Sequence, residues 1–348
     1  MHRRDRGSRT PAQGAACRRL ARHGRRRGRR RRPRLPSRDP HRSAGLVSRA
    51  IGVGLILPIF SGDASKVLQA ARDAERLGFD GVFAYDHFFP PGGPPDRPAL
   101  EAFACLGAVA ACTERVAIGT LVTRAVLRPP GLLAKMAATL DLVSGGRMIL
   151  GMGSGDAIDA GEQRAIGMRS LGLEERRVHL AETTAALKAL FRGDAYEGGT
   201  MVPPLRGPLL PAPNRPVGPP VWLGGRSDEV VRIAGSLADG WNGWGLDEPS
   251  FRRKAELLAE EAGRNGRDAE ATWAGISLVG VDDVETAAML EERRAAGMPE
   301  PAWTGSAIGF VEHLRRLASA GATWAIVVLA GRPGRRELIA ERVLPALG

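Results

Sequence analysis

The sequence has few cysteines, few lysines and no long apolar segment. Its three cysteines, Cys17, Cys105 and Cys112, form no Cys-x-x-Cys pair and no Cys/His cluster with the spacing of a zinc site. Their odd number, together with the absence of a secretory signal pattern, indicates a reducing, cytoplasmic location. No run of 18 apolar residues occurs, which argues against a membrane-spanning helix. We therefore expect neither a bound metal nor a membrane partner.

Several motifs that would assign a common chemistry are also missing. The sequence contains no GxGxxG dinucleotide motif and no GxxxxGK[ST] phosphate-binding loop. It also lacks the His-x-His pair of metal-hydrolase barrels and the GxSxG of serine hydrolases. A zinc hydrolase and a serine hydrolase are therefore disfavoured.

Positive charge is concentrated at the start of the chain. Residues 1–49 contain 18 Arg and 2 Asp, a net charge of +16, whereas the whole chain carries +12, so residues 50–348 carry −4. We expect residues 1–49 to be a disordered basic extension and residues 50–348 to form the folded domain. An arm that grips polyanions remains the alternative for the extension. The 46 Arg against 4 Lys favour biased coding and a misassigned start, so we expect no specific nucleic-acid partner.

From residue 50 onward, short apolar runs alternate with amphipathic stretches. The expected strands are 51–57, 79–85, 116–122, 147–153, 220–225, 238–242, 271–281 and 323–330. The expected helices are 64–77, 99–112, 131–143, 170–192, 227–237, 249–264, 283–296, 306–320 and 334–346. Eight strands, each followed by a helix, predict a parallel (β/α)8 TIM barrel with long loop insertions. A doubly wound sheet is the less favoured alternative.

Polar residues follow several of the expected strands. In a barrel, they would meet at the carboxyl end of the strands, where chemistry takes place. These residues are Asp86, His87, Arg124, Arg128, Asp156 and Arg226. Two long irregular segments, 86–98 and 193–219, are expected to form the far wall of a pocket, with a lid as the alternative role of the second. The glycines of GMGSGD (151–156) let a flat ligand approach the backbone, although an ordinary glycine-rich strand exit explains them equally well.

In order along the chain, these pieces resemble one family. FDGVFAYDHF (79–88), ATLDLVSGGR (138–147) with LGMGSGD (150–156), and VWLGGRSDEVVRIAGSLADGWN (221–242) are similar to the luciferase-like flavin or deazaflavin oxidoreductases, in particular to their coenzyme F420-dependent branch. The likeness covers about residues 50–348. It implies a barrel that holds a flavin or deazaflavin ring at its mouth, a small-molecule substrate and a homodimer.

The resemblance also implies roles for individual residues. Asp86 would bind cofactor, and His87 would face the substrate and accept a proton while hydride leaves. The alternative is that Asp86 only caps a helix and that His87 only lies on the surface. Asp156 stands where relatives place an acid near the ring; some have Glu there, and an N-cap role is equally compatible. A non-prolyl cis peptide would join Leu121 and Val122 behind the ring.

The cofactor's tail would lie over glycine-rich turns. Gly153, Ser154, Gly155, Gly224 and Gly225 would offer backbone N–H groups, and Arg226 would meet negative charge. Trp222, Trp241 and Trp244 either line the pocket or belong to the core. Glu162 and Arg177 are expected to make structural contacts only. Pro91 replaces a tryptophan of the sugar-phosphate-oxidising relatives, so their substrate is not assumed.

Taken together, the sequence predicts hydride transfer between coenzyme F420 and a small organic substrate. Oxygenation of a substrate with reduced FMN is the alternative, and no single residue separates the two. A cofactor-free barrel that only binds or supports other molecules is a third possibility, which uptake of either chromophore would exclude.

Overall fold

The computed structural model describes residues 49–90, 96–156 and 160–348. The strands are β1 (Gly52–Ile56), β2 (Gly81–Ala84), β3 (Ala117–Arg124), β4 (Met148–Gly153), β5 (Val221–Gly224), β6 (Gly240–Trp244), β7 (Glu270–Gly280), β8 (Trp303–Ser306) and β9 (Ala322–Ala330). The basic segment 1–48 and Pro91 lie outside the described residues.

Helices follow the strands as expected. They are α1 (Ala64–Arg76), α2 (Ala102–Cys112), α3 (Pro130–Val143), α4 (Ala160–Ala165), α5 (Leu173–Arg192), α6 (Asp228–Leu237), α7 (Glu248–Arg264), α8 (Asp283–Ala295), α9 (Ala307–Ser319) and α10 (Arg335–Arg342). Side chains cap several of them; for example, Asp63 accepts a hydrogen bond from the N–H of Ser65 at the start of α1.

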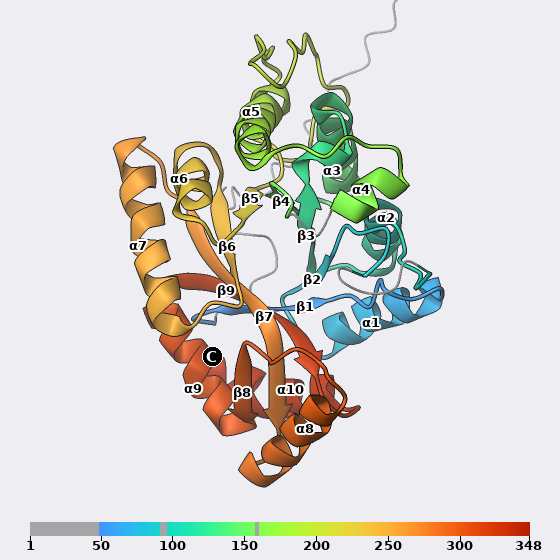
Figure 1. The fold of residues 1–348 in the computed structure, drawn as a ribbon, viewed down its shortest axis with the longest axis vertical. Coiled ribbons are helices and arrows are strands. Elements are labelled where there is room, and N and C mark those ends of the chain that lie inside the picture. Colours follow the sequence, from blue (N-terminus) through green and yellow to red (C-terminus); the bar gives the residue numbers. More distant parts are fainter. Residues whose placement is uncertain (1–48, 91–95, 157–159) are drawn as a thin grey trace, which may run out of the picture. The chain divides into compact units, whose positions relative to one another are not determined.

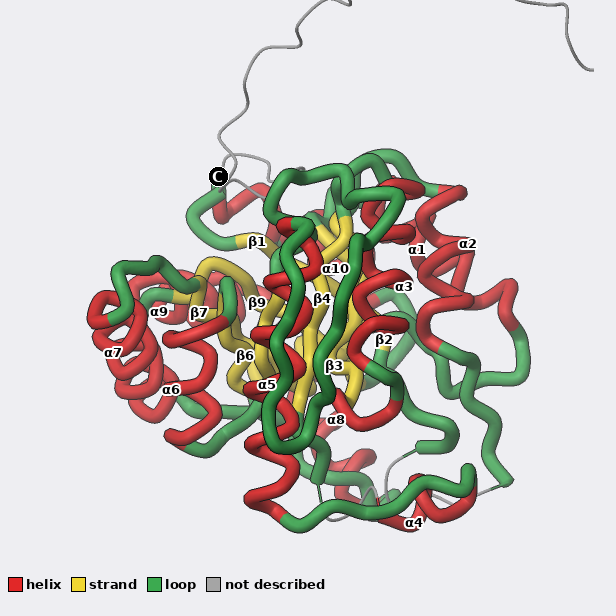
Figure 2. The backbone as a smooth tube through the Cα atoms, turned by 90° about the horizontal axis from the view of Figure 1, so that it is seen from above, coloured by secondary structure: helices red, strands yellow, loops and turns green. Residues whose placement is uncertain are grey.

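The predicted barrel is confirmed. Eight parallel strands pair in the order β1-β2-β3-β4-β5-β6-β7-β9, and the β1–β9 pairing closes the ring. Figure 2 shows the strands in the centre with helices around them. β8 was not predicted. It pairs only with the last residues of β7, from Ser277 to Gly280, and lies outside the ring (Figure 1).

Aromatic side chains fill the inside of the barrel. Phe83, Trp222 and Trp324 are almost completely buried there. The ring centroids of Phe83 and Trp222 are 5.9 Å apart, and those of Trp222 and Trp324 are 6.0 Å apart. Such close packing makes the interior a solid support for the loops at its ends rather than a channel.

The most distinctive stretch of the resemblance, ATLDLVSGGR, builds the opposite end of the barrel. Arg147 is buried, and its guanidinium donates to the carbonyls of Ala110, Thr113 and Val116 at distances of 2.8–2.9 Å. Its Nε also donates to the carbonyl of Ser144. The arginine thereby closes the connection between α2 and β3. The motif has a structural explanation that requires no ligand.

The interpretation of segment 193–219 as a lid or pocket wall is wrong for its last part. Its first part folds back on α5, where the Glu182 carboxylate accepts the N–H groups of Met201 and Val202 at 2.8 Å. Its last part reaches α3 and the amino end of β4, where Arg215 donates to Asp141 at 2.8 Å and to the carbonyl of Met148. Because Met148 begins β4, this contact lies at the end of the barrel away from the expected site.

Candidate active site

The carboxyl ends of the strands present an apolar floor. Ile56, Val122 and Trp244 are only partly buried and pack on the aromatic interior. The half-buried Tyr85 stacks on Phe60 with ring centroids 5.5 Å apart, and its ring centroid lies 5.9 Å from that of Trp244. Burial raises the pKa of Tyr85, so its hydroxyl stays protonated at neutral pH.

β3 is irregular where it reaches this floor. Its register with β4 shifts between Thr120 and Thr123, and the peptide bond between Leu121 and Val122 is cis, as the resemblance implies. The shift makes Thr120 and Thr123 point to different partners: Oγ1 of Thr120 donates to the carbonyl of Gly151 at 2.8 Å, whereas Oγ1 of Thr123 donates to Asp86 at 2.5 Å.

The glycines beside this bulge are required by the protein itself. A Cβ at Gly153 would lie 2.8 Å from Cγ2 of Val122, and one at Gly224 would lie 2.8 Å from Cγ1 of the same side chain. A Cβ at Gly151 would lie 2.2 Å from the carbonyl oxygen of Thr120. Val122 therefore occupies the space that these glycines leave, and a flat ligand over this part of the floor would meet Val122.

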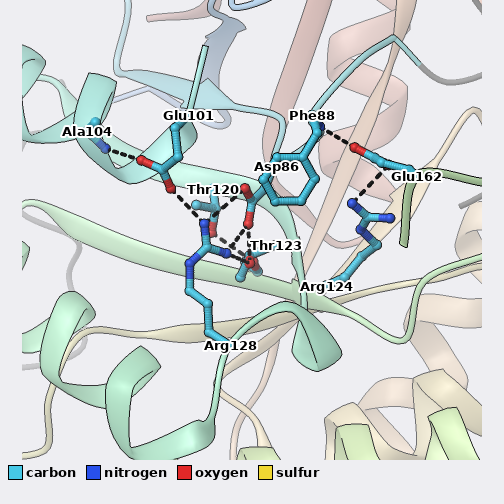
Figure 3. A network of polar contacts seen from close by, with 10 residues as sticks. Asp86, Phe88, Glu101, Ala104, Thr120, Thr123, Arg124, Arg128 and Glu162 are labelled. Atoms are coloured by element: carbon cyan, nitrogen blue, oxygen red, sulfur yellow. Dashed lines mark hydrogen bonds and ion pairs between the residues drawn. The ribbon is translucent and has the colours of Figure 1, made fainter. Parts of the chain in front are cut away.

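His87 contacts Glu162, a distant residue that is itself paired with Arg124. Its Nδ1 lies 3.1 Å from Oε2 of Glu162 in α4, and Nη2 of Arg124, the last residue of β3, lies 2.9 Å from the same oxygen. Oε1 of Glu162 accepts the backbone N–H of Phe88. Glu162 and Arg124 are each 3% exposed, and Figure 3 shows the backbone of Phe88 and the side chain of Arg124 each joined to Glu162.

The charge of Glu162 is maintained by these neighbours. Burial alone would raise the pKa of its carboxyl, but the hydrogen bonds from His87 and Phe88 and the charge of Arg124 hold the pKa below its usual value. An ionised carboxylate only accepts hydrogen bonds, so Nδ1 of His87 must carry the proton. The sequence indicated structural contacts alone for Glu162. The structure places it against the candidate catalytic histidine.

Asp86 is engaged in a separate network. Its carboxylate faces Arg128, with Nη1 at 2.5 Å and Nη2 at 3.2 Å, and Nη2 also lies 2.6 Å from Glu101 (Figure 3). The Arg128 guanidinium stacks 4.7 Å above the centre of the Phe103 ring. Because Asp86 is only 2% exposed, its visible role is to fix the start of the loop after β2, directly before His87.

The remaining candidates lie after β4 and β5. Ser154, Gly155 and Asp156 follow the end of β4, with Asp156 exposed and Gly155 at φ +78°. Arg226 follows β5 and is exposed. The N–H of Gly225 is donated to the carbonyl of Asn242 at 3.3 Å, so the expectation that it serves a ligand is wrong.

Of the three candidate tryptophans, two belong to the core and one lies at the site. Trp222 lies inside the barrel, and Trp241 packs on Phe251 while its indole donates to the carbonyl of Gly225 at 2.8 Å. Trp244 alone reaches the floor. Arg177 pairs with Glu174 and Glu229, as expected of a structural residue.

The part of the chain that the structure describes contains no group of three His, Cys, Asp or Glu side chains arranged to hold a metal ion. Among the same residues, no helix is long and apolar enough to cross a membrane.

This barrel and its mouth define a known class of proteins. The model of the luciferase-like monooxygenase family matches residues 42–342, and the chain belongs to this family. An F420-dependent glucose-6-phosphate dehydrogenase of Microbacterium testaceum is 34% identical over 174 residues, which are 48% of this chain and 49% of that protein. The same-named enzyme of Nakamurella multipartita is 32% identical over 212 residues, which are 58% of this chain and 59% of that protein. The chain thus matches about half the length of these curated relatives.

Solved structures share the fold at lower identity. An F420-dependent secondary alcohol dehydrogenase, solved with an F420-acetone adduct, has a TM-score of 0.73 and 19% identity, covering 86% of this chain and 99% of its own. An EDTA monooxygenase from Chelativorans sp. BNC1 has a TM-score of 0.70 and 15% identity, covering 86% and 93%. At these identities the similarity shows the fold alone.

Proposed function

We propose that this protein is an oxidoreductase that transfers a hydride between coenzyme F420 and a small organic substrate at the mouth of the barrel. The observation that carries the proposal is His87, fixed by Glu162 at the edge of the apolar floor. The relatives whose names include F420 dependence support the choice of cofactor.

The mouth fits a planar redox cofactor. Val122 and Trp244 offer a partly exposed apolar surface backed by the packed interior, which suits one face of an aromatic ring system. Polar groups surround this surface: His87 after β2, Asp156 after β4 and Arg226 after β5. We infer that the cofactor side of the site is formed by Asp86, Leu121, Val122, Gly153, Ser154, Gly155, Gly224 and Arg226. A bound deazaflavin supplies or accepts a hydride at its C5 carbon.

His87 provides the proton chemistry in this proposal. With Nδ1–H donated to Glu162, the neutral ring presents Nε2 as a hydrogen-bond acceptor. Nε2 would accept the hydroxyl proton of an alcohol substrate, and Glu162 would stabilise the imidazolium that results. Arg124 keeps Glu162 ionised and thereby keeps it from taking the proton itself.

Asp156 is the second candidate catalytic group. It lies exposed shortly after the end of β4, which only β3 separates from β2, the strand that precedes His87. We propose that its carboxyl faces the polar edge of the cofactor ring. Its shorter side chain distinguishes it from the glutamate of some relatives and requires closer approach of the ring.

The test is a cofactor titration followed by a substrate screen. The full-length protein is titrated with oxidised F420 and, separately, with FMN, and fluorescence quenching is measured. Quenching by F420 but not FMN, followed by deazaflavin reduction with one of a panel of alcohols or oxidation with enones and carbonyl compounds, is the expected result. Binding of FMN alone, with oxygen consumption when it is reduced, would establish the monooxygenase instead.

Gel filtration with light scattering tests the expected homodimer.

Absence of any chromophore uptake at saturating concentrations of both cofactors would reject a redox role.

A further inference from the structure

A cavity extends from the mouth toward the outside of the barrel between α1 and α10. Its volume is about 1160 Å³, large enough for a small organic molecule. Its inner end is apolar and includes Ile56, Phe60 and Tyr85, together with the last part of β9. The ring centroids of Phe60 and Tyr85 lie 6.3 and 6.4 Å from that of His87, so this end borders the candidate catalytic histidine.

The outer end of the cavity is strongly basic. Two acidic side chains, Asp63 and Glu337, line it against six basic ones, namely Lys66, Arg72, Arg97, Arg332, Arg335 and Arg336. This excess contrasts with the net charge of −4 carried by residues 50–348 as a whole. A concentration of one charge in a cleft of low dielectric attracts ligands of the opposite charge.

Half of these cations have no acidic partner among the residues that the structure describes. Arg332 and Arg335 pair with Glu292 and Glu285 at 2.5 and 2.9 Å, and Arg336 lies 3.9 Å from Asp73. Within residues 49–90, 96–156 and 160–348, by contrast, no carboxylate lies within 4.0 Å of the side-chain nitrogens of Lys66, Arg72 or Arg97.

The two acidic residues at this end leave the six basic side chains with an excess of four positive charges. The carboxylate of Asp63 is turned to its own helix, where it accepts the N–H and the hydroxyl of Ser65 at 3.0 and 2.6 Å. α10 begins at Arg335, with Gly334 at its N-cap, and no side chain caps its first turn. The uncapped N–H groups of this turn add partial positive charge, which Glu337 in the same turn partly offsets.

We propose that the outer end of this cavity binds the phosphate or carboxylate group of an anionic ligand whose apolar part lies against Phe60 and Tyr85. Taken with the proposed function, on which this part of the inference rests, the substrate is a small molecule with one anionic end and its reacting carbon near His87. The anionic side chain of the cofactor has the same chemistry and is the second source of such a group.

Hydrogen exchange of the full-length protein tests the site with inorganic phosphate as the probe. Exchange is followed by mass spectrometry in phosphate and in chloride at equal ionic strength, in peptides covering 63–76 and 331–342. We expect the amides of the first turns of α1 and α10 to exchange about tenfold more slowly when phosphate is at ten times its dissociation constant. The exchange of peptides from the basic segment 1–48 is analysed separately, because this segment could bind phosphate through its own arginines.

Variants make the test specific. The double variant Lys66→Gln/Arg72→Gln should lose the phosphate-dependent slowing, while its exchange in chloride stays as in the wild type. The matched control, Arg232→Gln, removes an exposed arginine of α6 and should keep the slowing. Slowing that is absent from the wild type, or equal in the double variant, would overturn the proposal.

A second measurement identifies the source of the anionic group. The affinities of wild type and Lys66→Gln/Arg72→Gln are compared for F420 and for the same deazaflavin without its anionic side chain. Weaker binding of F420 alone assigns the site to the cofactor's side chain, whereas unchanged binding of both, with phosphate protection lost, assigns it to the substrate. If neither deazaflavin binds, the proposed function fails, and the phosphate experiment still decides the site.

Discussion

Glu162 accepts the Nδ1 proton of His87 at 3.1 Å although the two residues are 75 positions apart. The same carboxylate pairs with Arg124 at 2.9 Å and accepts the N–H of Phe88. Four groups from three segments thus determine which nitrogen of one imidazole faces the mouth. A buried carboxylate held in this way acts on a reaction through the histidine and needs no contact with substrate.

The first prediction concerns this positioning role. Glu162→Gln should lower kcat about 10- to 100-fold with a smaller change in KM, because the amide can no longer fix the tautomer or stabilise imidazolium. His87→Ala should lower kcat by about 100-fold or more and leave F420 affinity unchanged. Steady-state kinetics and a cofactor titration measure both effects.

The tautomer of His87 provides a control for this prediction that does not depend on activity. Nitrogen NMR of the histidines should show His87 protonated at Nδ1 in the neutral wild type and a mixture in Glu162→Gln. Adding Glu162→Gln to His87→Ala should cause little further loss of kcat, because the two groups act as a unit. Independent, additive losses would show that Glu162 has only a structural role.

The second prediction concerns the ion pair behind His87. Arg128→Met should lower the free energy of unfolding by about 3–5 kcal/mol, because it leaves the buried Asp86 carboxylate without its bidentate partner. Adding Asp86→Asn should recover most of the loss. Urea unfolding measures both variants, and equal stability of Arg128→Met and wild type would contradict the assignment.

The barrel could be predicted because most of its strands are buried runs of apolar residues followed by a helix of distinct period. β8 was not predicted because it lacks such an apolar run. Trp303–Ser306 is a half-exposed strand of four residues, Trp-Thr-Gly-Ser, with no apolar run. The six-residue α4 is too short to establish a helical period, and it carries Glu162.

The site was predictable only where it depends on position along a strand. His87 and Asp86 follow β2, and this alone places them at the mouth. Their partners could not be predicted, because Glu162 and Arg128 are brought to them by the closure of the barrel and no local pattern encodes a contact across 42 or 75 residues. The glycine-rich ends of β4 and β5 are visible in the sequence, but the sequence cannot show that Val122 fills the space beside Gly153 and Gly224.

The third prediction follows from that packing. Gly153→Ala should destabilise the protein by about 1–3 kcal/mol, since its Cβ would overlap Cγ2 of Val122. Val122→Ala should relieve most of this loss in the double variant. Gly107→Ala in α2 is the matched control: its Cβ meets nothing within 4 Å, and we expect it to stabilise the protein by about 0.5–1 kcal/mol. Urea unfolding of the four proteins measures the effects, and a destabilisation that Val122→Ala leaves unchanged would show that another neighbour opposes the methyl group.

The last prediction concerns Glu270, the first residue of β7, at the end of the barrel away from the site. Burial and the nearby charge of Asp239 raise the pKa of its carboxyl to about 7, whereas its value in the unfolded chain is near 4.5. Between these two values the unfolded chain releases the proton and the folded protein retains it. The free energy of unfolding should therefore fall as the pH rises from about 4.5 to 7, and the loss is complete above that range.

Glu270→Gln has no proton to release, so its stability relative to the wild type should be greater at pH about 8 than at pH about 4. Urea unfolding at the two pH values measures the difference, with exposed Glu256→Gln in α7 as the matched control that should follow the wild type. Turnover should be unchanged in both variants, because Glu270 lies at the far end of β7 from His87. Parallel pH profiles for wild type and Glu270→Gln would mean that this carboxyl ionises in the folded protein as it does in the unfolded chain.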